Sequence, residues 1–365
     1  MQNRPSQNTS ETDVIIVGAG LIGLSIAYRL AKRGKKVLII EKEKVGTKAS
    51  WASGGMIQPV KENSGDPQFL KVCMDSASMY PAFVAEIEKD SGMDVEYQAK
   101  GGIILAFDEE EKAKLKEKQT FVKENGFQAD LLDRRKVLEK EPAINASVVA
   151  GLFVPSDAQV NNRNLVAALR KALSSFDVLI EENNEVTGLM ETDTVIGVKT
   201  KKGERKASET IICAGAWTSQ LLDQTHIIPI RGQMIRYDAK SLRTNGYILV
   251  HHPHYAIPRK DGSMIIGSTM DDVGFADHPT EAGIAELKAA AHQFIPRFKN
   301  CPLIEIWSGL RPKNEDSLPI IGKVKEGLHV AAGHFRTGIL LAPLTSKLIE
   351  QEIMTGIPNK VYAVR

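Results

Sequence analysis

Residues 14–30 read VIIVGAGLIGLSIAYRL, and a second apolar run, VLIIE, follows at residues 37–41. The opening VIIV is short and β-branched, which favours a buried parallel strand over a helix. The glycines after it are typical of an abrupt turn, and the apolar residues that follow predict a helix. The stretch therefore predicts a strand, a tight turn, a helix and a second strand, which is the order of an α/β fold.

The glycines of this stretch have the spacing GxGxxG. Gly18 permits the turn, Gly20 lets a phosphate approach bare backbone, and Gly23 lets the helix lie close to the strand. Glu41 ends the second strand, where a carboxylate can accept hydrogen bonds from an adenosine ribose. Although GxGxxG alone is a weak signal, the strand, the helix and the acidic residue all lie where the motif requires them. They predict a dinucleotide site, and Glu41 disfavours NADP.

Composition limits the class of protein. The chain has 365 residues, 42% hydrophobic and 25% charged, which suits a soluble protein of two domains or one large α/β domain. A net charge of +2 gives no reason to expect nucleic acid or a membrane as partner. Glycines interrupt the apolar run, and Glu11 and Asp13 precede it, so it is neither a signal peptide nor a membrane span. The chain has three cysteines without CxxC spacing, Cys73, Cys213 and Cys301. They predict neither a disulfide framework nor a zinc site, and they favour a reducing, cytoplasmic location.

Residues 47–56, TKASWASGGM, are rich in small side chains. Such a segment suits a loop whose backbone runs beside a planar ligand, and the alternative is a flexible surface loop. Further along, Asn161 or Asn164 can cap a helix that runs to Leu173. The other elements predicted before residue 220 are a helix at 67–91, a strand at 102–107, a helix after Asp108, and strands at 177–181, 184–190, 194–200 and 209–217.

Residues 227–306 have the pattern of an antiparallel sheet, with strands at 232–237, 247–251, 255–259 and 264–268. A turn at residues 260–262 joins the last two strands, and Thr280 begins a helix towards Phe294. Residues 327–343 again predict a strand, a glycine-bearing loop and a helix. We therefore predict a discontinuous dinucleotide-binding domain and an inserted antiparallel substrate-binding domain, with the limits 1–90, 150–225 and 320–365 for the first and 91–149 and 226–319 for the second.

The strands predicted for the dinucleotide domain come from the start, middle and end of the chain, whereas a nicotinamide enzyme usually completes one βαβαβ unit first. This interleaving resembles the FAD-dependent amine and amino-acid oxidases of the D-amino-acid oxidase superfamily, and among them the bacterial glycine oxidases. The likeness spans nearly the whole chain. It rests on residues 14–23 with Glu41, HYAIPR at 254–259, a GLRP turn at 309–312 with PIIG at 319–322, and AGHFRTGILLAP at 332–343. The first match is common among flavoproteins, and the other three are far more specific.

The resemblance implies a Rossmann-like FAD-binding domain of the GR2, or D-amino-acid oxidase, type and FAD as cofactor. It implies noncovalent FAD, because the cysteine that tethers the flavin in the related monomeric sarcosine oxidases is missing near Arg311. The loop from His334 to Leu340 would lie beside the isoalloxazine. Together with the glycine turn, the positions that look like FAD contacts are Gly18, Gly20, Leu21, Ile22, Gly23, Glu41, Lys42, Ala49, Ser50, Gly54, Gly55, Met56, Val186, His334, Phe335, Arg336, Thr337, Gly338, Ile339 and Leu340.

The resemblance also implies a substrate site. Tyr255 and Arg311 would hold the substrate carboxylate, Arg336 would lie at or near the same pocket, and Met270 would form its wall. A guanidinium suits this task because it is permanently charged and forms two parallel hydrogen bonds with a carboxylate. The alternative for Arg311 is a surface arginine in a loop before a proline, and that for Tyr255 is a core tyrosine with a backbone partner.

A metal site is a competing interpretation of His251, His252 and His254, but no acidic residue or cysteine stands at ligand spacing. We therefore expect no metal.

By the same resemblance the protein oxidises glycine, sarcosine and small D-amino acids by hydride transfer to the flavin. The products would be a 2-oxo acid such as glyoxylate, ammonia or an amine, and hydrogen peroxide from dioxygen, and the role would be synthesis of the thiamine thiazole. A homotetramer is expected by family analogy. One alternative is a D-amino-acid or amine dehydrogenase that passes electrons to a quinone. Another is a flavin-binding subunit or tRNA-modifying scaffold without amino-acid turnover.

Overall fold

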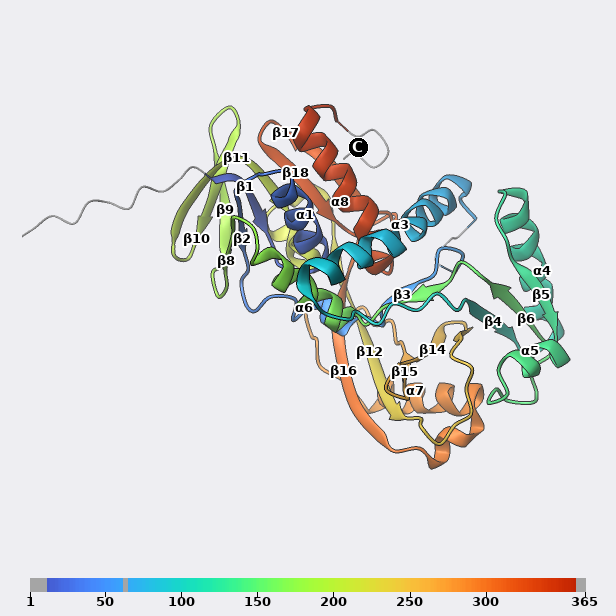
Figure 1. The fold of residues 1–365 in the computed structure, drawn as a ribbon. Helices are drawn as coiled ribbons and strands as arrows, with labels where there is room; N and C mark the ends of the chain where they lie inside the picture. Colours follow the sequence, from blue (N-terminus) through green and yellow to red (C-terminus); the bar gives the residue numbers. More distant parts are fainter. Residues whose placement is uncertain (1–11, 62–64, 359–365) are drawn as a thin grey trace, which may run out of the picture.

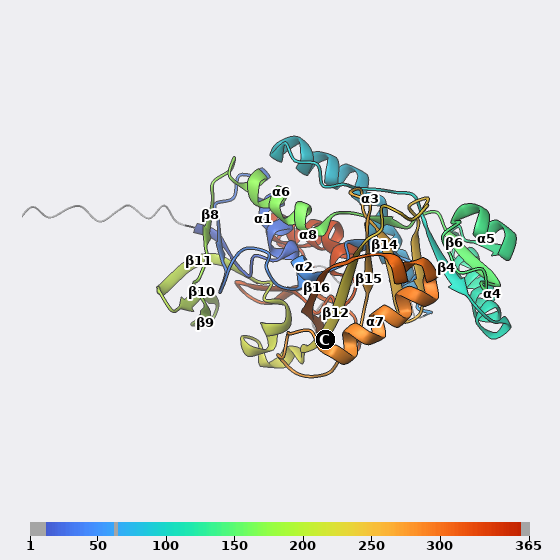
Figure 2. The same cartoon turned by 90° about the horizontal axis from the view of Figure 1, so that it is seen from below.

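The computed structural model describes residues 12–61 and 65–358 (Figure 1). Within these residues the chain forms two eight-stranded sheets and a two-stranded ribbon. One large sheet lies under a layer of helices, and the other extends away from it, with β12 and β16 running between the two regions (Figures 1 and 2). The predicted α/β class is confirmed.

The first sheet has the strand order β17-β18-β11-β1-β2-β8, and β10 and β9 continue from β11. Strands β18, β11, β1, β2 and β8 pair in parallel, whereas β17 pairs antiparallel with β18. The chain thus returns twice to the sheet that its first residues begin, as the interleaved pattern predicted. The strands are β1 (Thr12–Val17), β2 (Val37–Ile40), β8 (Val178–Glu181), β9 (Val186–Glu191), β10 (Val195–Thr200), β11 (Gly203–Ile212), β17 (Ile320–Lys325) and β18 (Leu328–Ala332).

The strand predicted at residues 209–217 has different limits. β11 begins at Gly203, pairs antiparallel with β10 and then parallel with β1, and ends at Ile212. Gly215 has a φ of 55°, which takes the backbone out of the extended region, and it begins the 3₁₀ helix η1 (Gly215–Gln220). Cys213 and Ala214 therefore lie in a loop at the carboxyl end of the strand.

Helices cover one face of the first sheet. Val14 and Ile16 of β1 belong to the apolar cluster that includes these helices, whereas Ile15 and Val17 belong to the cluster on the other face with Val186. This alternation is that of a strand buried on both faces. The covering helices are α1 (Leu21–Lys32), α3 (Pro67–Ser91), α6 (Asn162–Leu173) and α8 (Gly338–Thr355).

The second sheet has the strand order β16-β12-β15-β14-β13-β4-β6-β5. It is not wholly antiparallel, because β13 pairs in parallel with β4, which lies much earlier in the chain. Its strands are β4 (Gly102–Ala106), β5 (Asp130–Asp133), β6 (Ala150–Val154), β12 (Ile228–Asp238), β13 (Ile248–His251), β14 (His254–Pro258), β15 (Ser263–Gly267) and β16 (Leu303–Lys313). Strands β3 (Met56–Ile57) and β7 (Ala158–Gln159) form the ribbon.

One prediction about the second sheet needs correction, and one predicted domain limit does not coincide with a limit of the sheet. The GLRP stretch is not a turn but part of β16, where Arg311 pairs with Ile230 of β12. Strand β6 lies in the second sheet, although the predicted domain boundary at residue 150 assigned it to the dinucleotide domain. Both differences come from pairing with strands distant in the sequence, which local patterns do not reveal. The division into two domains stays a prediction.

The remaining helices lie mainly around the second sheet. Thr280 caps α7 by accepting a hydrogen bond from the Gly283 amide, and Asn161 caps α6 in the same way from Asn164, as predicted. These elements are α2 (Ala49–Ala52), α4 (Glu109–Glu124), α5 (Arg134–Lys140), α7 (Glu281–Phe294), η2 (Asp223–Thr225) and η3 (Pro296–Asn300). In the described part of the chain no helix is both long and apolar enough to cross a membrane.

A buried histidine connects α8 to the first sheet. His329 of β18 lies 3.1 Å from a carboxylate oxygen of Glu209 on β11 and 3.2 Å from one of Glu352 on α8. Burial by itself would lower the pKa of His329, but the hydrogen bonds and charges of the two glutamates outweigh it and raise the pKa above the ordinary 6.5. The fold therefore favours the charged imidazolium.

This histidine makes stability depend on pH. Because the folded-state pKa of His329 is raised, its contribution is fully present below about pH 6.5 and is lost as the pH rises through the folded value. We expect His329→Gln to lower the free energy of unfolding by about 1–3 kcal/mol at pH 6 and by less at pH 8.5. Urea unfolding at the two pH values measures this, with exposed His278→Gln as control. Equal losses at both pH values would contradict the assignment.

Candidate active site

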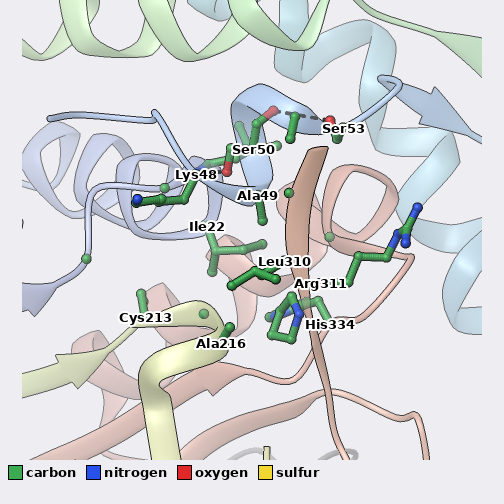
Figure 3. Close-up of a pocket in the computed structure, with 18 of the residues that line it drawn as sticks. Ile22, Lys48, Ala49, Ser50, Ser53, Cys213, Ala216, Leu310, Arg311 and His334 are labelled. Atoms are coloured by element: carbon green, nitrogen blue, oxygen red, sulfur yellow. Dashed lines mark hydrogen bonds between the residues drawn. The ribbon is translucent and has the colours of Figure 1, made fainter. Parts of the chain in front are cut away.

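A cavity of about 490 Å³ lies where the two large sheets meet. The carboxyl ends of β1, β2, β11 and β18 open into it, which is where parallel α/β sheets bind ligands. The opposite wall comes from β12, β14 and β16 of the second sheet. Figure 3 shows Ile22, Ala49 and Ser50 from the first part of the chain facing residues from β16 and the loop after β18 across this space.

The glycine turn of β1 and α1 has little room for side chains. Gly18 has a φ of 107°, and a Cβ there would lie 2.4 Å from the carbonyl oxygen of Cys213. A Cβ on Gly23 would lie 2.1 Å from the carbonyl oxygen of Gly18, so Gly23 keeps the helix against the strand, as the motif predicted. Gly23 itself does not line the cavity, whereas Gly18 and Gly20 do.

Glu41 lies at the end of β2 and lines the cavity. Its carboxylate is buried and accepts hydrogen bonds from the amides of Ala19, at 2.8 Å, and Glu43, at 3.0 Å. These bonds fix the turn after β1 to the end of β2. Each carboxylate oxygen has two lone pairs, so Glu41 can accept further hydrogen bonds from a ribose.

The segment at residues 47–56 is held by side chains from distant elements, which contradicts the alternative of a flexible surface loop. The Asn162 amide donates to the carbonyls of Ser50, at 2.8 Å, and Trp51, at 2.9 Å. The Trp307 indole donates to the carbonyl of Ala52 at 2.9 Å. The Ser50 hydroxyl in turn accepts from the Leu21 amide at the start of α1, at 2.8 Å. The backbone of this segment therefore forms a fixed wall.

Arg259, at the end of the HYAIPR stretch, holds the glycine pair of this wall. Its guanidinium donates to the carbonyls of Gly54, at 2.8 Å, and Val160, at 3.1 Å. Burial lowers the pKa of Arg259 to about 10, so the side chain remains charged at neutral pH. A Cβ on Gly55 would lie 2.0 Å from the Val160 carbonyl oxygen, so the close approach requires glycine.

Tyr255 and Arg311, the two residues predicted to bind the substrate carboxylate, both line the cavity. The guanidinium of Arg311 donates to the Ser268 hydroxyl at 2.5 Å and to the Thr269 carbonyl at 3.2 Å. A Cβ on Gly232 of β12 would lie within 2.3 Å of this guanidinium, so glycine leaves the space that Arg311 occupies. Tyr255 is 5% exposed, and its hydroxyl contacts the Met234 sulfur at 3.9 Å. A sulfur is a weak acceptor, so the hydroxyl can still donate to a ligand.

The loop after β18 closes the cavity on the α8 side. His334 lines it and lies 3.0 Å from the Thr345 hydroxyl, and burial lowers the pKa of His334 to about 4, so the ring is neutral at physiological pH. The Phe335 amide donates to the Pro312 carbonyl at 2.8 Å, which fixes the loop to the end of β16. Arg336 also lines the cavity.

Of the residues predicted for the site, most line the cavity: Gly18, Gly20, Leu21, Ile22, Glu41, Lys42, Ala49, Ser50, Gly54, Gly55, Met56, Val186, Tyr255, Arg311, His334, Phe335, Arg336, Gly338 and Ile339. Thr337 and Leu340 do not. The Thr337 hydroxyl donates to the His334 carbonyl, and Leu340 is buried in the core, where its carbonyl accepts from Ser76. These two residues therefore support the loop after β18 without lining the cavity.

Met270 does not form a wall of the cavity, so that prediction is wrong. Its side chain is 53% exposed. The next residue, Asp271, forms two backbone hydrogen bonds with Arg231. The amide of each residue donates to the carbonyl of the other at 2.9 Å. Thr269 is buried and its carbonyl accepts from Arg311, whereas Met270 is exposed.

Several lining residues were not predicted. Cys213, Ala214 and Gly215 line the cavity at the carboxyl end of β11, and the small residues after a buried strand were a usable signal for them. The centre of the Trp217 ring lies 3.3 Å from the Lys42 ammonium. Burial lowers the pKa of Lys42. Lys61 lies in the wall beside Tyr255, with no local sequence signal.

Of the three histidines weighed as a metal site, His251 and His254 lie opposite each other on β13 and β14. His251 lies 2.8 Å from Glu111, and His254 lies 3.4 Å from Glu286. Among residues 12–61 and 65–358, no group of three or more histidine, cysteine, aspartate or glutamate side chains could hold a metal ion.

These features are typical of a dinucleotide-binding flavoprotein: the glycine turn, the carboxylate at the end of β2 and the cavity between the two sheets. The chain belongs to the FAD dependent oxidoreductase (DAO) family, whose model matches residues 13–352. It is thus an FAD-dependent oxidoreductase with the DAO-type FAD-binding fold.

Individual relatives support this assignment. The chain is 31% identical to the glycine oxidase of Pseudomonas aeruginosa over 94% of both chains. It is 34% identical to the bifunctional protein ThiO/ThiG of Trichormus variabilis. The alignment covers 94% of this chain but only 52% of that relative's length. The crystal structure of glycine oxidase from Geobacillus kaustophilus superimposes with a TM-score of 0.89, at 31% identity and with 94% of both chains covered.

The Arg259 contacts lead to a prediction about FAD affinity. Arg259→Met would leave the buried Gly54 and Val160 carbonyls without their donor and loosen the wall at residues 54–55. We expect the dissociation constant for FAD to rise about tenfold or more, measured by titrating apoprotein with FAD. Arg135→Met, which alters only an exposed ion pair with Glu139, is the control. Unchanged FAD affinity in Arg259→Met would remove the proposed role.

Proposed function

We propose that this protein oxidises glycine, sarcosine and small D-amino acids to a 2-oxo acid, such as glyoxylate, and ammonia or an amine. The observation that carries the proposal is the presence of both Tyr255 and Arg311 in the lining of the cavity. A site that only held a cofactor would have no use for a cation and a phenol at this place. The glycine oxidases among the relatives agree with this substrate class.

Arg311 orients the substrate. Ser268 and Thr269 hold one side of its guanidinium, so the remaining N–H groups can bind a carboxylate through parallel hydrogen bonds. The Tyr255 hydroxyl can donate to the same carboxylate. Arg336 is proposed to lie beside this pair. Fixing the carboxylate in this way aims the Cα–H bond, and the positioning supplies most of the catalysis.

The cofactor would be held by groups already described: the bare backbone at Gly18 and Gly20 for the pyrophosphate, Glu41 for the ribose, and the walls at residues 49–56 and 334–339. When bound, FAD supplies the two-electron chemistry that oxidises the substrate. The neutral His334 ring adds no charge to this wall.

Noncovalent attachment of FAD remains part of the proposal. Cys213 does line the cavity, but burial raises the pKa of its thiol and keeps it protonated, and a protonated thiol is a poor nucleophile. Cys301 is buried in the apolar cluster around α7. We also propose, by family analogy, a cytoplasmic homotetramer that uses dioxygen and supplies a product for the thiamine thiazole.

Peroxide formation tests the reaction. We expect the holoprotein in air to produce one hydrogen peroxide and one glyoxylate for each glycine consumed, measured by a coupled peroxidase assay and by analysis of the 2-oxo acid. Omitting glycine is the control. Flavin reduction by glycine without peroxide, together with reduction of an added quinone, would instead indicate a dehydrogenase.

The carboxylate clamp leads to a second prediction. Arg311→Ala should raise KM for glycine by a hundredfold or more, about 3 kcal/mol, because the substrate charge loses its partner. Arg311→Lys should recover only part of this loss, since an ammonium lacks the planar fork. Exposed Arg297→Ala is the matched control. An unchanged KM in Arg311→Ala would exclude Arg311 from the site.

A further inference from the structure

The guanidinium of Arg311 is held by the segment that follows β15. It donates to the Ser268 hydroxyl and to the Thr269 carbonyl, so the positions of these two acceptors determine where the guanidinium lies. An arginine side chain has several rotatable bonds, and ordering it only when a ligand binds would cost affinity. The quality of Arg311 as a carboxylate-binding group therefore depends on what holds residues 268 and 269 in place.

The side chain of Asp271 holds this segment. One of its carboxylate oxygens accepts hydrogen bonds from three side chains: the Thr269 hydroxyl at 3.0 Å, the Gln233 amide at 2.9 Å and the Arg231 guanidinium at 3.0 Å. The Thr269 hydroxyl in turn accepts from the Gln233 backbone amide at 3.0 Å. Thr269, Gln233 and Arg231 are buried, and the Asp271 side chain is 27% exposed. Three buried donors therefore share one carboxylate as their acceptor.

Three successive residues of β12 connect Asp271 with Arg311. The side chains of Arg231 and Gln233 reach Asp271, whereas a Cβ on Gly232 would lie within 2.3 Å of the Arg311 guanidinium. Because side chains alternate between the two faces of a strand, Asp271 lies on the face of β12 opposite to that guanidinium. No ion pair joins Asp271 to Arg311 among residues 12–61 and 65–358. The two are linked through Thr269, which bonds to both.

The hydrogen bonds to Asp271 favour its charged form. Burial by itself would raise the pKa of Asp271, but the bonds from Gln233, Arg231 and Thr269 lower it below its usual value. An asparagine of almost the same size would keep one acceptor oxygen but not the charge. The buried Arg231 would then lose its anion, and the bond that restrains Thr269 would weaken.

We propose that Asp271 is a positioning residue for substrate binding: by restraining Thr269 it keeps the guanidinium of Arg311 in place to bind a carboxylate. This inference rests on the proposed function of the cavity and adds to it a residue outside the ligand's reach, because Asp271 does not line the cavity. Asp271 therefore changes how tightly a carboxylate binds and takes no part in the oxidation itself.

Binding of acetate tests the inference without turnover, because acetate has a carboxylate but no amino group to oxidise. The change in the flavin spectrum of the holoprotein on adding acetate gives its dissociation constant. We expect Asp271→Asn to raise this constant about tenfold and to leave the dissociation constant for FAD within about twofold of the wild-type value. Asp75→Asn, at an exposed ion pair with Lys71 on α3, is the matched control and should change neither constant.

Two variants of Thr269 distinguish positioning from a general loss of stability. Thr269→Val removes the hydroxyl that bonds to Asp271 and should weaken acetate binding about as much as Asp271→Asn does. Thr269→Ser keeps a hydroxyl and should weaken it much less. Should Asp271→Asn fail to fold, Thr269→Val decides, because it leaves the ion pair between Asp271 and Arg231 intact.

A double-mutant cycle tests whether Asp271 acts through Arg311. We expect Asp271→Asn to lower kcat/KM for glycine about tenfold in the otherwise wild-type protein, but less than about twofold in a protein that already carries Arg311→Ala. Two residues that acted independently would instead show the same loss in both backgrounds.

The outcomes separate this inference from the proposed function. Oxidation of glycine with wild-type acetate binding in Asp271→Asn and Thr269→Val, or an equal loss of kcat/KM with and without Arg311, would overturn the role of Asp271 and leave the proposed function intact. Acetate binding that depends on Asp271, in a holoprotein that oxidises no amino acid, would support the positioning role and overturn the proposed function.

Discussion

The structure depends on the hydrogen bond that joins the end of β16 to the loop after β18. The Phe335 amide donates to the Pro312 carbonyl at 2.8 Å, one residue after Arg311. This contact connects the second sheet, which contributes Arg311 and Tyr255, to the loop that follows the last parallel strand of the first sheet. Together with the bonds from Trp307 to Ala52 and from Arg259 to Gly54, it makes a wall that suits a flavin and a wall that suits a carboxylate part of one cavity.

Buried polar side chains then fix the shape of that cavity. Asn162, Trp307 and Arg259 donate to four carbonyls of the segment at residues 47–56, those of Ser50, Trp51, Ala52 and Gly54. A backbone held in this way needs no bulky side chains of its own, so its small residues leave space for a planar ligand. The same principle applies at Gly232, where a missing Cβ makes room for the guanidinium of Arg311.

Local patterns in the sequence predicted the features of the structure that depend on interactions between residues close together in the chain. The glycine turn, the caps of α6 and α7, and most strands near the first sheet follow from short-range spacing, and the family resemblance then identified FAD. The errors have a common physical origin. Arg311 lies in a strand because Ile230 of β12, 81 residues earlier, pairs with it. Met270 is exposed next to Asp271, which pairs with Arg231. Lys61 gave no signal because only the fold brings it to the Tyr255 ring.

The central claim is that one cavity holds a flavin against an amino acid whose carboxylate is bound by Arg311 and Tyr255. Anaerobic mixing of the FAD-loaded protein with glycine, sarcosine, D-alanine and D-aspartate, while the visible flavin band is followed, tests it most directly. The account predicts that at least one of these amino acids bleaches the band in the wild-type protein, and that far higher concentrations are needed in Arg311→Ala. A band that none of them bleaches, or that bleaches equally well in Arg311→Ala, would contradict it.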